Sequence, residues 1–302
     1  MKEQEVIIVN IPKDIYREIV INAIKYALIS FPFTINRMQI NNINKRIYNI
    51  SKGKIAEGIF EYFCTENSIN TDFELCQTPF YKPDNRDFIF DNSEWDIKNN
   101  FIYHNTERFS ENKYTDLPAL IPSRNSHDQW GKRNIKKFDF TKSVNYVFTF
   151  MKISDKSKYS SFFDINLSNK QIEFIEKLSS KYRNSKQNSK PFEDDWFWEN
   201  MRCLKNGEPS FNLRETPSLV ITGYANYKYW DLFKITNKNE NNSYIDYNKK
   251  EWYKKLNNEK LSFLDGTIIT RIPNATVPVS MLPSFSSLFP YFEKRINYGK
   301  FI

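Results

Sequence analysis

The chain has 302 residues, of which 40% are hydrophobic and 17% aromatic, so it can bury a substantial core without disulfides or a structural metal ion. Its 44 Lys and Arg residues against 36 Asp and Glu give a net charge of +8, which favours a polyanionic partner such as nucleic acid. No apolar run approaches the roughly 18 residues of a membrane span, and no signal-peptide hydrophobic region begins the chain, so we expect a cytoplasmic protein without a membrane partner.

Cysteine and histidine usage limits the metal chemistry. Cys64, Cys76 and Cys203 are scattered and lack C-x-x-C spacing, so they predict buried small side chains and neither a disulfide framework nor a zinc site. With only His104 and His127, the chain is a poor match to zinc hydrolases and to nucleases that need several histidines. Any metal ion should therefore be bound by carboxylate oxygens, which suits Mg2+.

The front of the chain is predicted to be helical. Apolar residues recur at helical spacing from Ile11 to Phe31, and Pro12 stands where a helix can begin. Two more helices are expected, at about 36–48 and, after Ser51-Lys52-Gly53, at 54–66.

The pattern then changes to that of strands, and helices and strands alternate further on. Strands are expected at 73–80, 87–90, 94–103, 144–152 and 219–224. A helix is expected at 169–182, an exposed loop at 183–190, and a short closing helix after Pro283 within the proline-containing region 268–297. The Asn- and Lys-rich region 237–260 indicates either a solvated insertion or a DNA-facing surface. The elements together predict an α/β fold with a mixed sheet.

A β-hairpin carries the most informative pattern. Asp91 and Asn92 tolerate positive φ and can form a two-residue turn, which would place Asp87 directly opposite Asp96. Since side chains alternate between the faces of a strand, one face would be apolar, with Phe88, Phe90, Trp95 and Ile97. The other face would carry Asp87, Glu94, Asp96 and Lys98, with Ile89 its one apolar member.

The polar face of this hairpin has the residue types that phosphodiester hydrolysis needs. Two carboxylates facing each other at about 5 Å repel and destabilise a hairpin, unless a cation lies between them, and a divalent metal ion would supply that charge. Lys98 lies two residues beyond Asp96 on the same face, where its ammonium can hold a water next to the metal ion. Such a metal ion generates a nucleophile and stabilises charge that develops on the phosphate.

Asp87-Phe88 followed by Asp96-Ile97-Lys98 resembles the PD-(D/E)xK nuclease superfamily. The run from Trp95 to Asn100 is particularly similar to the active-site strand of type II restriction endonucleases. This resemblance, which covers about residues 50–100, implies a restriction-endonuclease-like core: a central mixed β-sheet flanked by helices, here with a helical N-terminal part and C-terminal elaborations.

The resemblance also implies a third acid. The segment from Gly53 to Glu61 is similar to the family's helix that often carries a Glu completing the metal site, which gives the role to Glu57 and leaves Glu61 as its alternative. Arg86 replaces the family's Pro before Asp87, whereas a literal Pro-Asp pair ends at Asp84. A regular strand favours Asp87 as the metal ligand, and a bulge would favour Asp84.

We therefore expect a Mg2+-dependent endodeoxyribonuclease, most similar to type II restriction endonucleases. We expect DNA, double-stranded in the leading interpretation, as the partner, although the sequence leaves the strand preference open. The resemblance implies 5′-phosphate and 3′-hydroxyl products, and it suggests a homodimer if the target is palindromic. Alternatives are a PD-(D/E)xK nuclease of DNA repair or of phage or mobile-element DNA processing, and a non-catalytic DNA-binding protein.

Two groups of residues are candidate DNA contacts. They are Asn99 and Asn100 in the active-site strand, and the basic cluster Lys132, Arg133, Lys136 and Lys137. The helical N-terminus and catalytic core are expected within residues 1–155. Residues 156–302 would continue the same domain or form an accessory region for DNA recognition or dimerisation.

Overall fold

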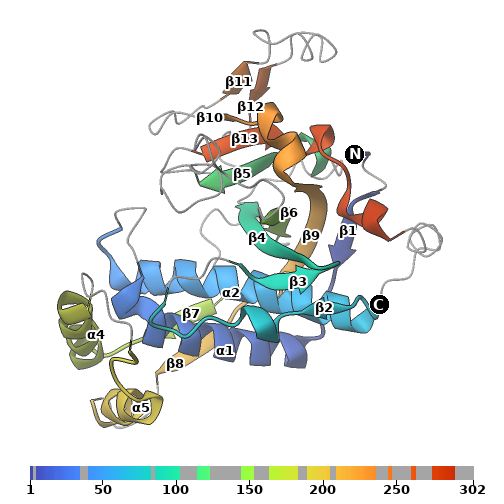
Figure 1. Cartoon of the computed structure of the whole chain (residues 1–302). Coiled ribbons are helices and arrows are strands. Elements are labelled where there is room, and N and C mark those ends of the chain that lie inside the picture. The colour runs from blue at the N-terminus through green and yellow to red at the C-terminus, as the bar shows by residue number, and fades with distance from the viewer. Residues whose placement is uncertain are drawn as a thin grey trace.

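A central mixed sheet separates two long helices from a second, smaller sheet (Figure 1). The computed structural model describes residues 1–2, 5–34, 40–82, 86–102, 114–122, 144–152, 163–182, 189–204, 209–235, 244–246, 260–262 and 274–289. The expected mixed α/β architecture, with a mixed sheet flanked by helices, is present.

The central sheet has six strands in the order β1-β9-β6-β4-β3-β2. Their bounds are β1 Ile7–Val9, β9 Ser218–Ala225, β6 Asn145–Lys152, β4 Ser93–Ile102, β3 Phe88–Phe90 and β2 Thr71–Asp72. β4 and β6 run parallel, and the other neighbours run antiparallel. Strands that are far apart in the sequence, such as β1 and β9, therefore share a sheet with the predicted hairpin.

The smaller sheet has the order β10-β13-β5 and covers the face of the central sheet that is opposite the long helices (Figure 1). Its strands are β10 Lys234–Ile235, β13 Asn274–Pro278 and β5 Pro118–Pro122. Two strand pairs stand apart, β7 Phe163–Asn166 with β8 Ser210–Leu213, and β11 Tyr244–Asp246 with β12 Lys260–Ser262. Short 3-10 helices are η2 Phe31–Phe33, η3 Glu74–Cys76, η4 Tyr114–Asp116, η6 Tyr227–Leu232, η8 Val279–Met281 and η9 Phe285–Leu288.

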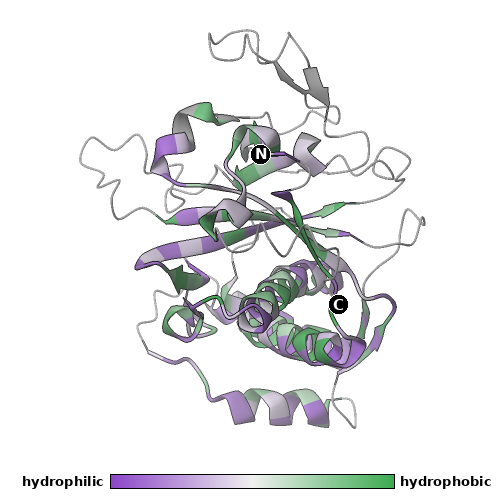
Figure 2. Cartoon of the chain, turned by 90° about the vertical axis from the view of Figure 1, so that its right-hand side faces the viewer, coloured by the Kyte–Doolittle hydropathy of each residue, from purple (hydrophilic) through white to green (hydrophobic). Residues whose placement is uncertain are grey.

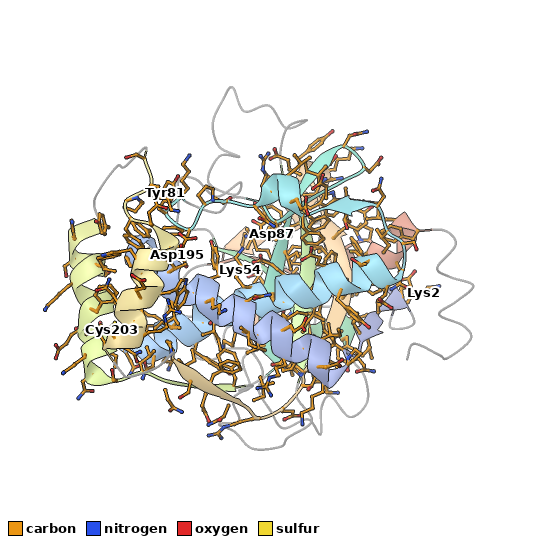
Figure 3. The ribbon with its side chains drawn as sticks, turned by 90° about the horizontal axis from the view of Figure 1, so that it is seen from below. Lys2, Lys54, Tyr81, Asp87, Asp195 and Cys203 are labelled. Carbon is orange, nitrogen blue, oxygen red and sulfur yellow. The ribbon has the colours of Figure 1, made fainter. Side chains whose placement is uncertain are left out.

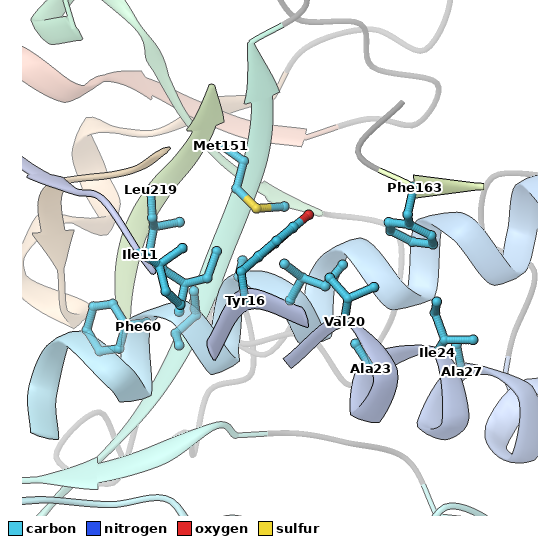
Figure 4. Packing of buried hydrophobic residues seen from close by; sticks show 14 of the residues in the cluster. Ile11, Tyr16, Val20, Ala23, Ile24, Ala27, Phe60, Met151, Phe163 and Leu219 are labelled. Carbon is cyan, nitrogen blue, oxygen red and sulfur yellow. The ribbon is translucent and has the colours of Figure 1, made fainter. Parts of the chain in front are cut away.

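Helix α1, Lys13–Ser30, confirms the first predicted helix. Its apolar stripe, which includes Tyr16 and Val20, is buried against α2 and the sheet residues Met151 and Leu219 (Figure 4). Burial of each large aliphatic side chain contributes about 1.5–3 kcal/mol before the entropy cost of ordering is counted. Seen nearly end-on, α1 and α2 show both hydrophobic and hydrophilic bands (Figure 2). No described helix is both long enough and apolar enough to span a bilayer.

Helix α2, Ile43–Glu66, replaces two predicted helices with one. The expected break at 51–53 was wrong because packing on both sides of it is continuous: Ile47 and Ile55 are both fully buried. Gly53 costs a helix only about 1 kcal/mol relative to Ala, which that burial outweighs. The N-terminus is fixed at Asn42, whose side chain accepts a hydrogen bond from the backbone N–H of Lys45 at 2.9 Å.

The predicted strand at 73–80 was also wrong. The strand is β2, and η3 follows it at Glu74–Cys76. Asp72 accepts a hydrogen bond from the backbone N–H of Leu75 at 2.9 Å, which favours a turn. The apolar signal came from Phe73, whose ring stacks on that of Phe88 with 5.2 Å between the centroids, although the backbone of Phe73 lies outside the strand β2.

The remaining predicted elements agree closely with the structure where it describes them. The strands corresponding to 87–90, 94–103, 144–152 and 219–224 are β3, β4, β6 and β9, and α4, Asn169–Tyr182, has the predicted bounds. The closing helix after Pro283 is the 3-10 helix η9. Helix α5, Asp194–Cys203, was not predicted, and Cys203 is exposed rather than buried.

Candidate active site

The predicted hairpin forms through a turn of two residues with positive φ, 49° at Asp91 and 53° at Asn92. Such a turn matches the twist of the flanking strands, and Asn and Asp accept the left-handed conformation more readily than other residues with side chains. The resulting register pairs Phe88 with Trp95 and Ile89 with Glu94, as expected.

The two faces of β4 differ as the alternation predicted. Trp95 and Ile97 are 4% and 8% exposed and belong to the same core cluster as α2, and the Trp95 ring stacks on Phe88 at 5.9 Å. Asp96 and Lys98 project from the opposite face, with about a fifth of each side chain exposed. Lys98 Nζ lies 2.6 Å from Asp96 Oδ2, and it also lies over the ring of Tyr146 on β6, 5.3 Å from the centroid. A largely water-excluded ion pair therefore lies on the polar face.

Asp87 departs from the regular pairing. Its backbone N–H donates to the carbonyl of Trp95 at 2.8 Å, although Trp95 is already the partner of Phe88. Two successive residues thus face one residue of β4, as in a β-bulge, and β3 begins only at Phe88. Asp87 is therefore not directly opposite Asp96.

The bulge turns the Asp87 carboxylate toward β4. Its Oδ2 accepts a hydrogen bond from the backbone N–H of Ile97 at 2.5 Å. Because this nitrogen belongs to the peptide that joins Asp96 to Ile97, backbone dimensions place Asp87 Oδ2 within about 5 Å of the Cα atom of Asp96. The Asp87 carboxylate thus contacts the backbone between Asp96 and Lys98, whereas the side chains of Asp96 and Lys98 pair with each other on the polar face.

Asp87 also lines a pocket of about 560 Å³ between α1, α2 and residues 73–78. Glu57 and Glu61, the two predicted helix acids, line the same pocket. Figure 3 shows Lys54 and Asp87 near each other beside α2. Since α2 packs on the Trp95 face, Glu57 lies on the other side of the sheet from the Asp96–Lys98 pair, and Asp87 is the residue common to both groups.

The two helix acids have different surroundings. Glu57 Oε2 is bound to Lys54 Nζ at 2.6 Å, one turn earlier on α2, with 23% of each side chain exposed. Burial, followed by the charge of Glu74, raises the pKa of Glu61 above its ordinary value. Glu57 therefore has a cationic partner, whereas burial disfavours the charged form of Glu61.

Lys54 and Arg86 are site residues that the motif did not identify. Lys54 pairs with Glu57 and lies over the ring of Tyr26, and Arg86 pairs with Glu94 across the hairpin. The spacing of three residues between Lys54 and Glu57 on a helix was the available signal for the first pair.

The candidate DNA contacts in β4 lie on different faces. Asn99 Oδ1 accepts a hydrogen bond from Thr149 at 3.1 Å on the helix side, and its Nδ2 is buried with no hydrogen-bond partner among the residues that the structure describes. Asn100 alternates to the face of Asp96 and Lys98. The basic cluster Lys132, Arg133, Lys136 and Lys137, as well as Asp84, lies outside the described residues.

The carboxylates of Asp87 and Asp96 are the candidate metal ligands of the hairpin. Among the residues that the structure describes, no three His, Cys, Asp or Glu side chains gather closely enough to hold a metal ion. Mg2+ commonly uses one or two carboxylates, and water and substrate phosphate complete its shell. Asp87 and Asp96 could supply such a pair of carboxylates.

No protein-family description, curated protein sequence or solved structure matches the chain.

Proposed function

We propose that the chain is a Mg2+-dependent endodeoxyribonuclease of the PD-(D/E)xK type, similar to type II restriction endonucleases. One observation carries the proposal: the Asp87 carboxylate binds the peptide N–H between Asp96 and Lys98, and these two side chains form an ion pair on the same strand. The helix before the hairpin and the strand parallel to β4 agree with the mixed sheet that the resemblance implies.

The proposed chemistry divides among a few side chains. Asp87 and Asp96 would hold Mg2+, which when bound supplies an activated water and charge stabilisation at the phosphate. The Lys98 ammonium orients the attacking water and stabilises negative charge on the phosphate, and the low exposure of its side chain strengthens that interaction. Glu57 supports the metal site through water or by its negative charge next to Asp87.

The substrate and assembly follow from the same proposal. A net charge of +8 favours association with DNA, and the expected products carry a 5′-phosphate and a 3′-hydroxyl. A palindromic target would favour a homodimer because protein and DNA would share a two-fold axis.

Plasmid cleavage tests the proposal. The chain should convert supercoiled plasmid to discrete fragments with Mg2+ and leave it intact with EDTA. Asp96→Ala and Lys98→Ala should each lower the cleavage rate by about 100-fold or more, with DNA affinity measured in EDTA largely unchanged. Asp164→Ala is a matched control because it breaks an Asp–Arg ion pair of the same 2.6 Å length on β7, and it should cut normally.

The alternative functions give other outcomes. Nicking or a smear in place of discrete fragments would indicate a nuclease of repair or mobile-element DNA processing. Binding without cleavage would indicate a DNA-binding protein with a structural hairpin. Full activity of Asp96→Ala or Lys98→Ala would rule out the assigned active site.

A further inference from the structure

The pocket between α1 and α2 shares Asp87 with the proposed active site. Its volume of about 560 Å³ is that of a small-molecule site, and Asp87 belongs to its lining. A double helix is far too wide to enter a pocket of this size, whereas one component of a DNA strand can.

The lining combines flat aromatic rings with hydrogen-bonding groups. One wall is aliphatic, from Ile15, Ile19 and Ala23 of α1. Aromatic side chains and amides form another part of the lining: Tyr26, Tyr62 and Phe73 supply rings, and Asn22 and Gln77 supply donors and acceptors. A base that leaves its stack is recognised by this combination, because its faces stack on rings and its edge forms hydrogen bonds.

The charges of the pocket favour a neutral occupant over a phosphate. The two cations in the described lining are each engaged with an acid, Lys54 with Glu57 and Arg86 with Glu94. Three carboxyl groups, those of Glu57, Glu61 and Asp87, also line it. These acids would repel a phosphate inside the pocket, whereas they would not repel an uncharged base.

We propose that this pocket binds one unstacked nucleoside of the DNA substrate, with the base in the pocket and the adjoining phosphate outside it, where the Mg2+ of the proposed function would offset the negative charge of Asp87. The inference rests on the proposed nuclease function, whose substrate it specifies: the enzyme cuts beside a base that is extruded from the duplex or lies in a single strand. Entry of the base would fix the position of the neighbouring phosphate at Asp87.

Ligand-observed saturation-transfer NMR on the full chain tests this without Mg2+ or cleavage. The probes are the four deoxynucleosides at millimolar concentration, with inorganic phosphate as competitor. Gln77→Trp places a large side chain at an exposed position of the lining, and Leu75→Trp, at a 65% exposed position that does not line the pocket, is its control. We expect transfer to at least one deoxynucleoside, a loss of at least about fivefold in Gln77→Trp, and no loss in Leu75→Trp or with phosphate present.

Absence of transfer to every deoxynucleoside, or equal transfer in Gln77→Trp and the native chain, would overturn the pocket assignment. So would displacement of the deoxynucleoside by inorganic phosphate. These outcomes leave the proposed function standing if the plasmid is still cut in an Asp96-dependent way. Conversely, deoxynucleoside binding by a chain that cannot cut plasmid would refute the nuclease and retain the pocket.

Discussion

Asp87 and Ile97 are joined by a hydrogen bond in which a side-chain carboxylate accepts from a strand N–H, with 2.5 Å between the two atoms. Asp87 directly precedes β3, which begins at Phe88, and its side chain accepts from the Ile97 N–H in place of a backbone carbonyl. One carboxylate therefore aligns the strand that carries Asp96 and Lys98 and, in the proposed function, also binds the metal ion.

These two roles of Asp87 can be separated by substitution. Asp87→Asn keeps an oxygen that can accept from Ile97 but removes the negative charge, so stability should stay within about 0.5 kcal/mol of the native chain while cleavage is lost. Asp87→Ala removes the acceptor of the Ile97 N–H, so it should abolish cleavage and also lower the free energy of unfolding by about 1–3 kcal/mol. Urea unfolding and plasmid cleavage of both variants provide the measurements. Cleavage at the native rate by Asp87→Asn would show that Asp87 is only structural.

Glu57 and Glu61 should respond differently to neutralisation. Glu57→Gln removes an anion from the Asp87 pocket and should raise the Mg2+ concentration for half-maximal cleavage by about tenfold, whereas Glu61→Gln should leave it nearly unchanged. Burial raises the pKa of Glu61 above its ordinary value of 4.5, so above that pH the folded chain binds more protons at this carboxyl than the unfolded chain does. The contribution of Glu61 to the free energy of unfolding therefore falls as the pH rises above 4.5. Glu61→Gln should therefore be more stable than the native chain at neutral pH. If Glu61→Gln raised the Mg2+ concentration for half-maximal cleavage more than Glu57→Gln did, Glu61 rather than Glu57 would be the acid that supports the metal site.

The hairpin was predictable because its signals are local. Turn residues, alternation and the position of Asp96 two residues before Lys98 all lie within a dozen positions, so the sequence alone indicated the register. The sequence left a bulge open as the arrangement that would favour Asp84, which lies outside the described residues. The position of the bulge at Asp87 was not predictable, since it depends on competition between a side-chain acceptor and the ladder for one N–H of β4. The distribution of acids over both sides of the sheet depends on where α2 packs, which no local pattern contains.

The turn of the hairpin predicts opposite effects at one position. Asn92 has a φ of 53°, which glycine adopts without cost and β-branched residues resist. Asn92→Gly should leave the free energy of unfolding within about 0.5 kcal/mol of the native value or raise it, and Asn92→Val should lower it by about 1–2 kcal/mol. Chemical denaturation measures both. Equal stability of the two variants would contradict the two-residue turn.

Gly58 and Gly53 on α2 provide a second matched comparison. A Cβ atom at Gly58 would lie 2.7 Å from Cγ2 of Ile19 on α1, whereas at Gly53 it would meet nothing within 4 Å. Gly58→Ala should cost about 1–3 kcal/mol through overpacking of the two helices, and Gly53→Ala should gain about 0.5–1 kcal/mol from the lower entropy of the unfolded chain. Thermal unfolding checks the signs, and Ile19→Ala combined with Gly58→Ala should recover part of the loss. Stabilisation by Gly58→Ala alone would mean that α1 and α2 are packed less closely here.

Lys52 predicts how stability depends on pH. It is 4% exposed on α2, with Nζ 3.9 Å from the centroid of the Phe101 ring on β4 and 4.8 Å from that of Tyr48. Burial, followed by the charge of Lys45, lowers the pKa of Lys52 from 10.5 to about 7, although the ring faces favour the ammonium form and offset part of the burial cost. Between these two pH values the unfolded chain binds more protons than the folded chain, so stability rises with pH across that window.

Replacement of the Lys52 ammonium by a neutral side chain of similar length should remove this pH dependence. Lys52→Met should be more stable than the native chain at pH 7 and below, by an amount on the order of a few kcal/mol since each pKa unit corresponds to about 1.4 kcal/mol. The difference should shrink as the pH approaches 10.5, where Lys52 is neutral in the folded chain and increasingly so in the unfolded one. Lys25→Met, at an exposed position of α1, should leave the pH profile of the native chain unchanged. Chemical denaturation of the three proteins from pH 6 to pH 10 measures the effect, and parallel profiles for Lys52→Met and the native chain would show that Lys52 keeps its ordinary proton affinity in the fold.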